Sequence, residues 1–166
     1  MPTNEEVLNE LQSKFGNKVL KSEIDYDTLI VEVNREAAYD VLQYLKNESA
    51  TKLDILTTMC GLHFPEKKDA ELGVMYQVKN LVSGYSLRVK AYFPISNPKI
   101  KSVTSLFPSA NWQERQEYDF FGIEFEGHPN LKRILNVDDM DYFPMRKEYK
   151  LEDATRDDKE DKYFGR

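Results

Sequence analysis

The chain has 166 residues, of which 40% are hydrophobic and 31% are charged, a composition typical of a soluble globular domain. Its formal net charge is −6, so it lacks the basic surplus with which proteins bind nucleic acids non-specifically. Cys60 is the only cysteine, which excludes an internal disulfide and a cysteine-rich metal site built from this chain alone. The acidic start and the lack of a long apolar run argue against a secretory signal and a membrane span. We expect a reduced, cytoplasmic domain with no nucleic-acid partner and no direct membrane insertion.

The N-terminal two-thirds of the chain alternates between helix and strand patterns. Thr3 and Glu6 have the spacing of a capping box, which marks the start of a helix. The apolar residues that follow recur at helical spacing until Gly16, which is typical of a helix end. Further along, alternation on both sides of Ser83 and Gly84 gives the strongest hairpin signal in the chain. The predicted elements of this part are a helix over 4–15, strands over 19–24 and 28–33, a helix over 35–45 capped by Asn34, and strands over 53–60, 74–82 and 85–93.

The pattern changes after the last of these strands. Asn97 and Pro98 suit a helix cap followed by proline at the first helical position, so we expect a short helix that ends at Phe107. A second helix over 112–121 follows, with Gly122 at the position favoured after a helix end. Beyond that helix the periodicity fades, and the end of the chain has too few apolar groups to fold by itself.

Strands joined by hairpins and separated by helices predict an α+β fold. We expect a two-layer sandwich in which helices pack on a mostly antiparallel or mixed sheet, in the order helix, two strands, helix, three strands. We expect residues 1–125 to form this domain and residues 126–166 to form an irregular C-terminal extension. The composition of the last sixteen residues leaves open whether they stay mobile or lie on a partner.

Catalytic and metal-binding patterns are weak in this sequence. Cys60 ends an apolar strand, where a thiol usually behaves as a small hydrophobe, so a thiol nucleophile paired with His63 is disfavoured. The other histidine, His128, is far away along the chain. The acids in residues 138–141 lack the glycine and the terminal glutamate of a calcium loop, and the seven glycines form no phosphate loop. We therefore expect no catalytic, cofactor-binding or metal-binding residue in this chain.

Aromatic and charged residues are concentrated between residues 112 and 149. One short helix carries both kinds, and its Arg115 and Asp119 stand four positions apart, where an exposed ion pair is worth about 0.3 kcal/mol. Basic pairs then alternate with apolar residues along an irregular segment, which is the composition of a protein–protein contact surface. A solvated charged face with a few core anchors explains the composition equally well.

Three motifs in this part resemble the signature of the 30-kDa subunit family of respiratory complex I, whose bacterial members are lettered C. Residues 114–123 (ERQEYDFFGI) resemble its Glu-Arg-Glu motif, which continues with an acid, two apolar residues and glycine. Residues 127–135 (GHPNLKRIL) and residues 143–149 (FPMRKEY) are similar to its later elements, in the same order and at matching spacing. Gln116 departs from the family pattern, where a glutamate is usual, and this removes a charge at that position.

The resemblance implies a structural subunit of the peripheral arm of NADH-quinone oxidoreductase. Such a subunit supports electron transfer from NADH to quinone, coupled to proton translocation. The resemblance also implies that this chain binds no cofactor, because NADH, FMN, the iron–sulfur clusters and quinone belong to the partner subunits. The expected partners are the large subunit that helps to form the quinone pocket, lettered D in this family of complexes, and the neighbouring iron–sulfur subunits. We call the large subunit the quinone-pocket subunit. The resemblance implies that the irregular extension over residues 126–166 packs on this partner subunit. The expected location is the cytoplasmic side of the bacterial inner membrane, reached through those partners.

The resemblance also suggests roles for individual residues. The basic residues are expected to pair with acids on the partner or within the segment, and Trp112, Tyr118 and Phe121 are expected to be aromatic anchors. His128, which precedes Pro129, is expected to set a turn. The complete set of family-motif or interface residues is Trp112, Glu114, Arg115, Asp119, Phe121, Gly122, His128, Pro129, Lys132, Arg133, Pro144, Arg146 and Lys147.

Two alternatives stay open at this point. The first is the equivalent subunit of a membrane-bound hydrogenase or a formate-hydrogenlyase-type complex. The second is a freestanding acid–base enzyme that uses His128 with Glu114 or Asp119, which requires a concave pocket that brings these groups within hydrogen-bond reach.

Overall fold

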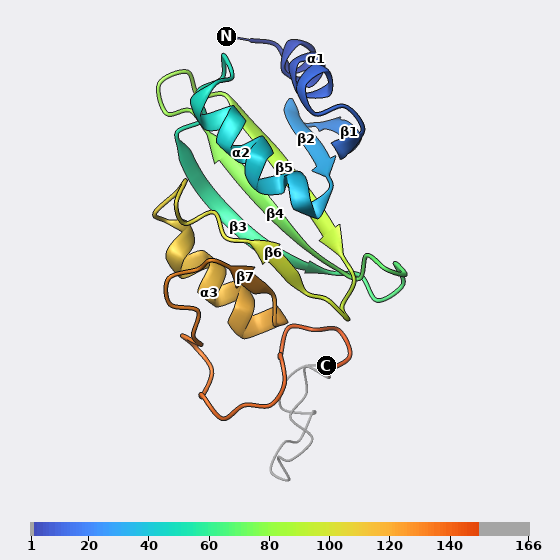
Figure 1. The fold of residues 1–166 in the computed structure, drawn as a ribbon, viewed down its shortest axis with the longest axis vertical. Helices are drawn as coiled ribbons and strands as arrows, with labels where there is room; N and C mark the ends of the chain where they lie inside the picture. Colours follow the sequence, from blue (N-terminus) through green and yellow to red (C-terminus); the bar gives the residue numbers. More distant parts are fainter. Residues whose placement is uncertain (1, 150–166) are drawn as a thin grey trace, which may run out of the picture.

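The computed structural model describes residues 2–149, and these form a mixed five-stranded sheet with helices on one face (Figure 1). The strand order is β1-β2-β5-β4-β3, in which β2 and β5 are parallel and the other neighbours are antiparallel. A short parallel pair, β6 with β7, lies outside this sheet. The elements are α1 (Asn4–Phe15), β1 (Val19–Asp25), β2 (Thr28–Val33), α2 (Ala38–Asn47), β3 (Ile55–His63), β4 (Leu72–Lys79), β5 (Ser86–Phe93), β6 (Lys99–Lys101), α3 (Ala110–Phe121) and β7 (Glu124–Glu126).

The predicted first helix and first hairpin are confirmed. The Thr3 hydroxyl accepts the Glu6 N–H at 3.2 Å, and the Glu6 carboxylate accepts the Thr3 N–H at 2.8 Å, which completes the capping box. Gly16 follows α1 with a φ of 55°, a conformation that glycine adopts without a Cβ penalty. Strands β1 and β2 then pair in an antiparallel hairpin.

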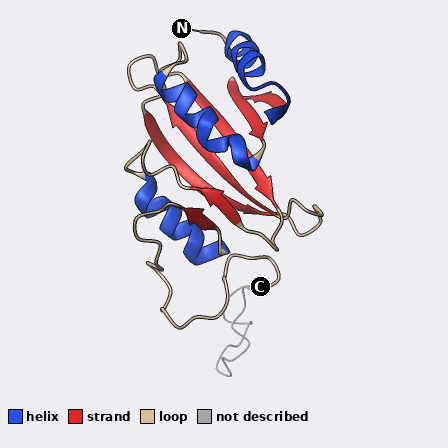
Figure 2. Cartoon of the chain, viewed as in Figure 1, coloured by secondary structure: helices blue, strands red, loops and turns tan. Residues whose placement is uncertain are grey.

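The core lies between the sheet and the helices on one of its faces. Alternate residues of β4 and β5 are buried on that face, among them Tyr76, Leu87 and Val89, which are fully buried. Helix α2 packs Val41 and Leu42 into the same cluster. Figure 2 shows this arrangement as a layer of helices over a layer of strands. The predicted two-layer α+β fold is therefore confirmed.

The predicted helix between Asn97 and Phe107 is wrong. Residues 99–101 form strand β6 instead, and a turn follows them. Ile100 is opposite Phe125 in the β6–β7 ladder, and the Glu124 N–H donates to the Pro98 carbonyl at 2.7 Å. The apolar residues of this stretch are buried as expected. The backbone of residues 98–102 pairs with residues 124–126, more than twenty residues away, and a local periodicity carries no information about such partners.

Other boundaries differ from the prediction by a few residues. The β4–β5 connection runs from Asn80 to Tyr85 and is not a two-residue turn, because the Asn80 side chain accepts the N–H groups of Val82 and Ser83 and widens the loop. Helix α2 begins at Ala38 after a 3₁₀ turn, and Asn34 makes no side-chain cap. Helix α3 begins at Ala110, two residues earlier than predicted.

The last regular element of the described chain ends at Glu126. From there to Tyr149 the chain is irregular and runs beside α3 (Figure 1), and its end reaches strand β3 at His63. The division of the chain at residue 125 into a domain and an extension stays a prediction, and residues 150–166 of the predicted extension lie outside the described residues. Within residues 2–149, no helix has the length and apolar character needed to cross a membrane.

Candidate interaction site

Helix α3 carries three acidic side chains that point into the protein. Glu114 and Asp119 are fully buried, and Glu117 is 2% exposed. Buried carboxylates are costly unless they accept hydrogen bonds, so each of them must have partners within the fold. The three acids accept backbone N–H groups from three different parts of the chain.

Glu114 fixes the turn that follows β6. Its carboxylate accepts the Val103 N–H at 2.7 Å and the Ser102 hydroxyl at 2.7 Å. Burial raises the pKa of Glu114 to about 7, and these two hydrogen bonds oppose the increase only in part. The Tyr76 hydroxyl is also buried and has no hydrogen-bond partner among the described residues. Glu114 therefore links α3 to the turn over residues 102–103.

Glu117 and Phe121 of α3 contact β3 at Gly61, where the helix and the strand lie close together. The Glu117 carboxylate accepts the Gly61 N–H at 2.6 Å, and burial raises the pKa of Glu117. A Cβ atom at position 61 would lie 2.5 Å from the Phe121 ring and 2.8 Å from the Glu117 carboxylate. Only glycine therefore permits this approach. Sequence reasoning missed Gly61 and Glu117, because the contact joins residues that are distant along the chain.

Asp119 organises the segment that follows β7. Its carboxylate accepts the N–H groups of Ile134, Leu135 and Asn136 at 2.8 to 3.1 Å, the Asn136 side-chain amide at 3.0 Å, and an Arg133 guanidinium N–H at 2.8 Å. Burial alone raises the pKa of a carboxyl group, but here the hydrogen bonds from Asn136, Leu135 and Arg133 outweigh it and hold the pKa of Asp119 well below its usual range.

The expected pair between Arg115 and Asp119 is not formed. Arg115 instead donates to the carbonyl oxygens of Lys132 at 3.0 Å and Arg133 at 3.2 Å. Arg133 forms the ion pair with Asp119 and also donates to the carbonyl oxygen of Met140 at 2.8 Å. Both arginines therefore link α3 to the segment. Arg115 lies on the helix and donates to the segment, and Arg133 lies on the segment and pairs with the helix.

The end of the described chain is attached in the same way. Arg146 donates to the Phe121 carbonyl at 2.8 Å, and the Phe143 ring lies where a Cβ on Gly122 would be, at 2.5 Å. The Lys147 N–H donates to Nδ1 of His63 at 2.9 Å. Burial lowers the pKa of His63, which favours the neutral ring that can accept this bond. His63 is thus a second contact that the sequence did not indicate.

His128 and Pro129 lie in the turn after β7. The Asn130 N–H donates to Nδ1 of His128 at 3.0 Å, so Nε2 of the ring is the atom that donates to the Asn111 carbonyl at 3.0 Å. Both nitrogens are therefore occupied in setting the turn. The structure does not bring His128 into hydrogen-bond contact with Glu114 or Asp119, so the acid–base enzyme is not supported.

Cys60 and His63 also lie apart. Cys60 is opposite Met75 and His63 is opposite Leu72, so the two side chains project from opposite faces of β3. Burial raises the pKa of the Cys60 thiol, and nearby Glu117 adds to this effect. Within residues 2–149, no cluster of three or more metal-ligating side chains is present.

Large apolar side chains stay exposed on α3 and on the segment after β7. Trp112 is 63% exposed, and the Arg115 guanidinium lies 4.9 Å from the centre of its ring. We define the C-terminal surface as these exposed apolar residues of α3 and of the segment. They are Trp112, Leu135, Val137, Tyr142, Met145 and Tyr149. Pro144 and Lys147 line a shallow depression beside Met145. Exposed apolar patches of this kind mark interaction sites.

The geometry defines a class of protein, namely an α+β domain in which a buried aspartate and an arginine of one helix hold an irregular, partly apolar segment. Residues 31–155 match the model of the family described as respiratory-chain NADH dehydrogenase, 30 Kd subunit. The chain belongs to this family. The resemblance noted in its sequence motifs is thereby confirmed.

Relatives and solved structures agree with this membership. The chain is 35% identical over 135 residues to the NADH-quinone oxidoreductase subunit lettered C of Streptomyces coelicolor, covering 81% of this chain and 54% of the relative. It is 35% identical over 146 residues to the subunit of the same name from Mycobacterium marinum, covering 88% and 61%. The chain thus spans little more than half the length of these relatives.

Two solved structures share the fold. A trypsin-resistant fragment of Nqo5, comprising residues 1–134, superposes with a TM-score of 0.66 and 32% identity, and the match covers 76% of this chain and 98% of that one. An archaeal membrane-bound sulfane sulfur reductase complex contains a chain that superposes with a TM-score of 0.73 and 22% identity, covering 89% and 85%. At that identity the second likeness shows the fold alone.

Proposed function

We propose that this chain is a structural subunit of the peripheral arm of an NADH-quinone oxidoreductase and carries no catalytic residue of its own. The observation that carries the proposal is that the motif residues of α3 make their contacts within this chain. Glu114, Arg115 and Asp119 make contacts inside the chain, and the contacts of Arg115 and Asp119 fix the segment after β7, which bears most of the exposed apolar residues. The chain's relatives are named as subunits of such an oxidoreductase, which supports the role.

The chemistry of NADH oxidation and quinone reduction belongs, in this proposal, to other subunits. NADH, FMN, the iron–sulfur clusters and quinone are bound by those partners. The saturated hydrogen bonding of Asp119 and His128 supports this division, because a group that transfers protons needs an unoccupied site for its substrate. This chain contributes to electron transfer and proton translocation by holding the assembly together.

The partner proposed for the C-terminal surface is the quinone-pocket subunit, with the neighbouring iron–sulfur subunits next to it. Trp112 on α3 and Leu135 and Val137 on the segment after β7 are each more than 60% exposed, and Asp119 fixes the backbone of the segment at Leu135. A preorganised surface loses little conformational entropy on binding, which favours a stable contact. The chain would thereby be a peripheral protein on the cytoplasmic side of the bacterial inner membrane, held there by its partners.

Paired substitutions test this surface. The variant Leu135→Ser with Val137→Ser removes two exposed apolar side chains from it. The matched control is Leu20→Ser with Ile24→Ser, which removes two side chains of β1 with similar exposure, 55% and 57%. Each tagged chain is purified from gently solubilised membranes of its own source. We expect the first variant to recover at least about tenfold less of the quinone-pocket subunit than the wild type, and the control to match the wild type.

Two outcomes contradict the proposal. One is recovery of the wild-type chain alone from the soluble fraction. The other is equal recovery of the quinone-pocket subunit by both double variants. The archaeal likeness at 22% identity shows only a shared fold, so the hydrogenase-type assembly is not favoured.

A further inference from the structure

The face of the sheet opposite α2 and α3 has an unusual charge distribution. In β4 and β5 every second residue is buried under the helices, and the residues between them are partly exposed on the other face. Strands β3, β4 and β5 contain no aspartate or glutamate, although the chain has 29 of these residues. Their outward positions instead carry Lys79, Arg88 and Lys90. We call the outward side chains of β3, β4 and β5 the basic sheet face.

The ladder registers place these cations among apolar side chains. Lys90 is opposite Met75, which is opposite Cys60, and Tyr92 is opposite Gly73 in the next row. The Tyr92 ring covers Gly73, since a Cβ there would lie 2.6 Å from it. Arginine, methionine and tyrosine are the residues enriched at the centres of protein interfaces.

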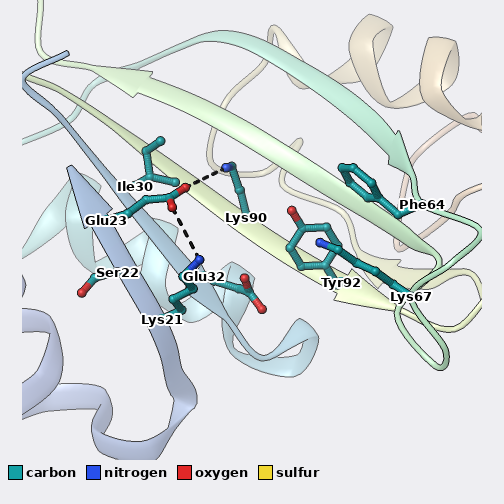
Figure 3. Close-up of a pocket in the computed structure, with 9 residues that line it drawn as sticks. All are labelled: Lys21, Ser22, Glu23, Ile30, Glu32, Phe64, Lys67, Lys90 and Tyr92. Carbon is teal, nitrogen blue, oxygen red and sulfur yellow. Dashed lines mark hydrogen bonds and ion pairs between the residues drawn. The ribbon is translucent and has the colours of Figure 1, made fainter. Parts of the chain in front are cut away.

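The β1 side of the same face is different, because two of its lysines, Lys21 and Lys90, pair with a carboxylate of the chain. A hollow of about 250 Å³ lies there (Figure 3). Glu23 pairs with Lys90 at 3.3 Å and with Lys21 at 3.6 Å across it. The Lys67 ammonium group lies over the Tyr92 ring, 4.5 Å from its centre. These cations already have partners.

Lys79 and Arg88 lack such compensation. Among residues 2–149, no carboxylate lies within ion-pair distance of either side chain. Arg88 donates to the Gln77 side chain at 2.6 Å, which orients the guanidinium but leaves its charge unbalanced. A basic area on a chain with a net charge of −6 attracts acidic partners selectively, because the rest of the chain repels them.

We propose that the basic sheet face docks an acidic segment of another protein subunit, through carboxylates that pair with Lys79 and Arg88 and apolar side chains that cover Met75. This contact is separate from the C-terminal surface. It is a second interface of the proposed subunit. The inference rests on the proposed function only in that the partner is another subunit of the same complex. Two faces of the chain would then hold two different parts of the assembly.

Photo-crosslinking in the assembled complex tests the inference. A photoreactive phenylalanine derivative replaces Met75 in the tagged full chain, which is irradiated in membranes of its own source, and the crosslinked peptides are identified by mass spectrometry. We expect a crosslink to one peptide of another subunit, with aspartate or glutamate close to the crosslinked residue. The Lys79→Glu, Arg88→Glu variant is expected to lower its yield at least about tenfold.

The matched control is Lys99→Glu with Lys101→Glu, which makes the same change of charge on β6, outside this sheet. It is expected to leave the crosslink yield unchanged. Equal thermal unfolding midpoints of both variants show that the fold is retained. Should Lys79→Glu, Arg88→Glu unfold, the neutral pair Lys79→Gln, Arg88→Gln takes its place, with a smaller expected loss.

Several results overturn the inference. They are the absence of a crosslink from position 75 in a wild-type chain recovered within the complex, a crosslink to a peptide without acids, and a crosslink to lipid, nucleic acid or a second copy of this chain. An equal yield in the two charge-reversal variants overturns it as well. If the wild-type chain is recovered only outside the complex, the result contradicts the proposed function instead. The crosslinks formed from position 75 in that soluble fraction then test the inference by the same criteria.

Discussion

Between Val7 and Phe125 most of the buried side chains are apolar, and they form one core under the sheet. Between Gly127 and Tyr149, by contrast, the chain is held mainly by hydrogen bonds that involve charged side chains, such as Asp119, Arg115 and Arg146. The first region gains stability in proportion to the area it removes from water. The second depends on a few donors and acceptors at defined distances.

This difference determines how each region responds to change. Apolar burial is shared among many side chains, so loss of one lowers the stability of the entire cooperative unit. The segment after β7 is attached at separate points along α3, and loss of one acceptor leaves several buried N–H groups without a partner. We therefore expect substitutions in the core to act globally and substitutions at the contacts between α3 and the segment after β7 to act locally.

Leu87→Ala should have the largest effect on stability. Leu87 is fully buried in the centre of the sheet, and truncation of such a side chain costs about 3–4 kcal/mol in transfer and cavity terms. Urea unfolding should show one transition at a lower midpoint, with trypsin cleavage after Lys132 appearing at the same urea concentration. Leu20→Ala, at a side chain that is 55% exposed, is the control and should change the free energy of unfolding by less than about 0.5 kcal/mol. Selective release of the C-terminal segment by Leu87→Ala would contradict this expectation.

Asp119→Ala should free the segment and leave the sheet folded. The substitution leaves Arg133 and the N–H groups of residues 134–136 without their acceptor, a local loss of about 3 kcal/mol. Trypsin should cleave after Lys132 or Arg133 much faster in native buffer, while the unfolding midpoint of the sheet stays close to that of the wild type. Asp138→Ala, at an exposed acid of the same segment, is the control.

The same contact predicts a pH dependence. Because the folded pKa of Asp119 lies below its usual value, the stabilisation is complete above about pH 4 and is lost as the pH falls through the lowered pKa. Protection of the Leu135 amide against hydrogen exchange should therefore decrease in the wild type as the pH falls below about 4, and the Asp119→Ala variant should show no such dependence. Slow cleavage of that variant at neutral pH would refute the role of Asp119.

Glu114→Gln should change how stability depends on pH. The pKa of Glu114 is about 7 in the fold and about 4.5 in the unfolded chain, so the fold favours the protonated form. The free energy of unfolding therefore falls between about pH 4.5 and pH 7 and is constant above, with a total loss of roughly 2–3 kcal/mol from this group. Glutamine keeps an acceptor for Val103 and removes the charge. Urea unfolding at pH 5 and pH 8 should show a smaller difference for the variant than for the wild type, and an equal difference would contradict the assignment.

The sequence was sufficient to predict the fold because local patterns encode most of it. The capping box at Thr3, the alternation in β5 and the glycine after α3 each depend on residues that are neighbours along the chain. The helix expected over 97–107 was wrong for the opposite reason. Burial of Ile100 does not distinguish a helix from a strand. Ile100 is in a strand because its backbone pairs with β7, where it is opposite Phe125.

The candidate site was predictable in its location but not in its contacts. The motif residues lie together on α3 and on the segment after it, as the sequence spacing suggested. Whether Arg115 contacts Asp119 or a carbonyl oxygen depends on how the irregular segment folds back, and no periodicity describes that path. Gly61 and His63 lie in β3 just beyond the strand predicted over 53–60, and their contacts with α3 and Lys147 give no local signal.

Gly122→Ala should have the smallest effect, and it isolates one attachment point of the segment. Gly122 has a φ of 71°, which costs an alanine about 1 kcal/mol. A Cβ there would also lie 2.5 Å from the Phe143 ring, so the ring and the backbone after it must shift. Gly84→Ala is a matched control, because Gly84 has a φ of 77° and nothing within 4 Å of the added Cβ. It shares the backbone cost without the clash.

Comparison of the two variants gives the contribution of the Phe143 contact. Both should lower the thermal unfolding midpoint by a few degrees, since about 1 kcal/mol has that effect in a domain of this size. Only Gly122→Ala should also speed hydrogen exchange at the Lys147 amide, because displacement of Phe143 moves the backbone away from His63. Equal exchange at Lys147 in both variants would show that the bond to His63 holds the end of the segment without help from Phe143.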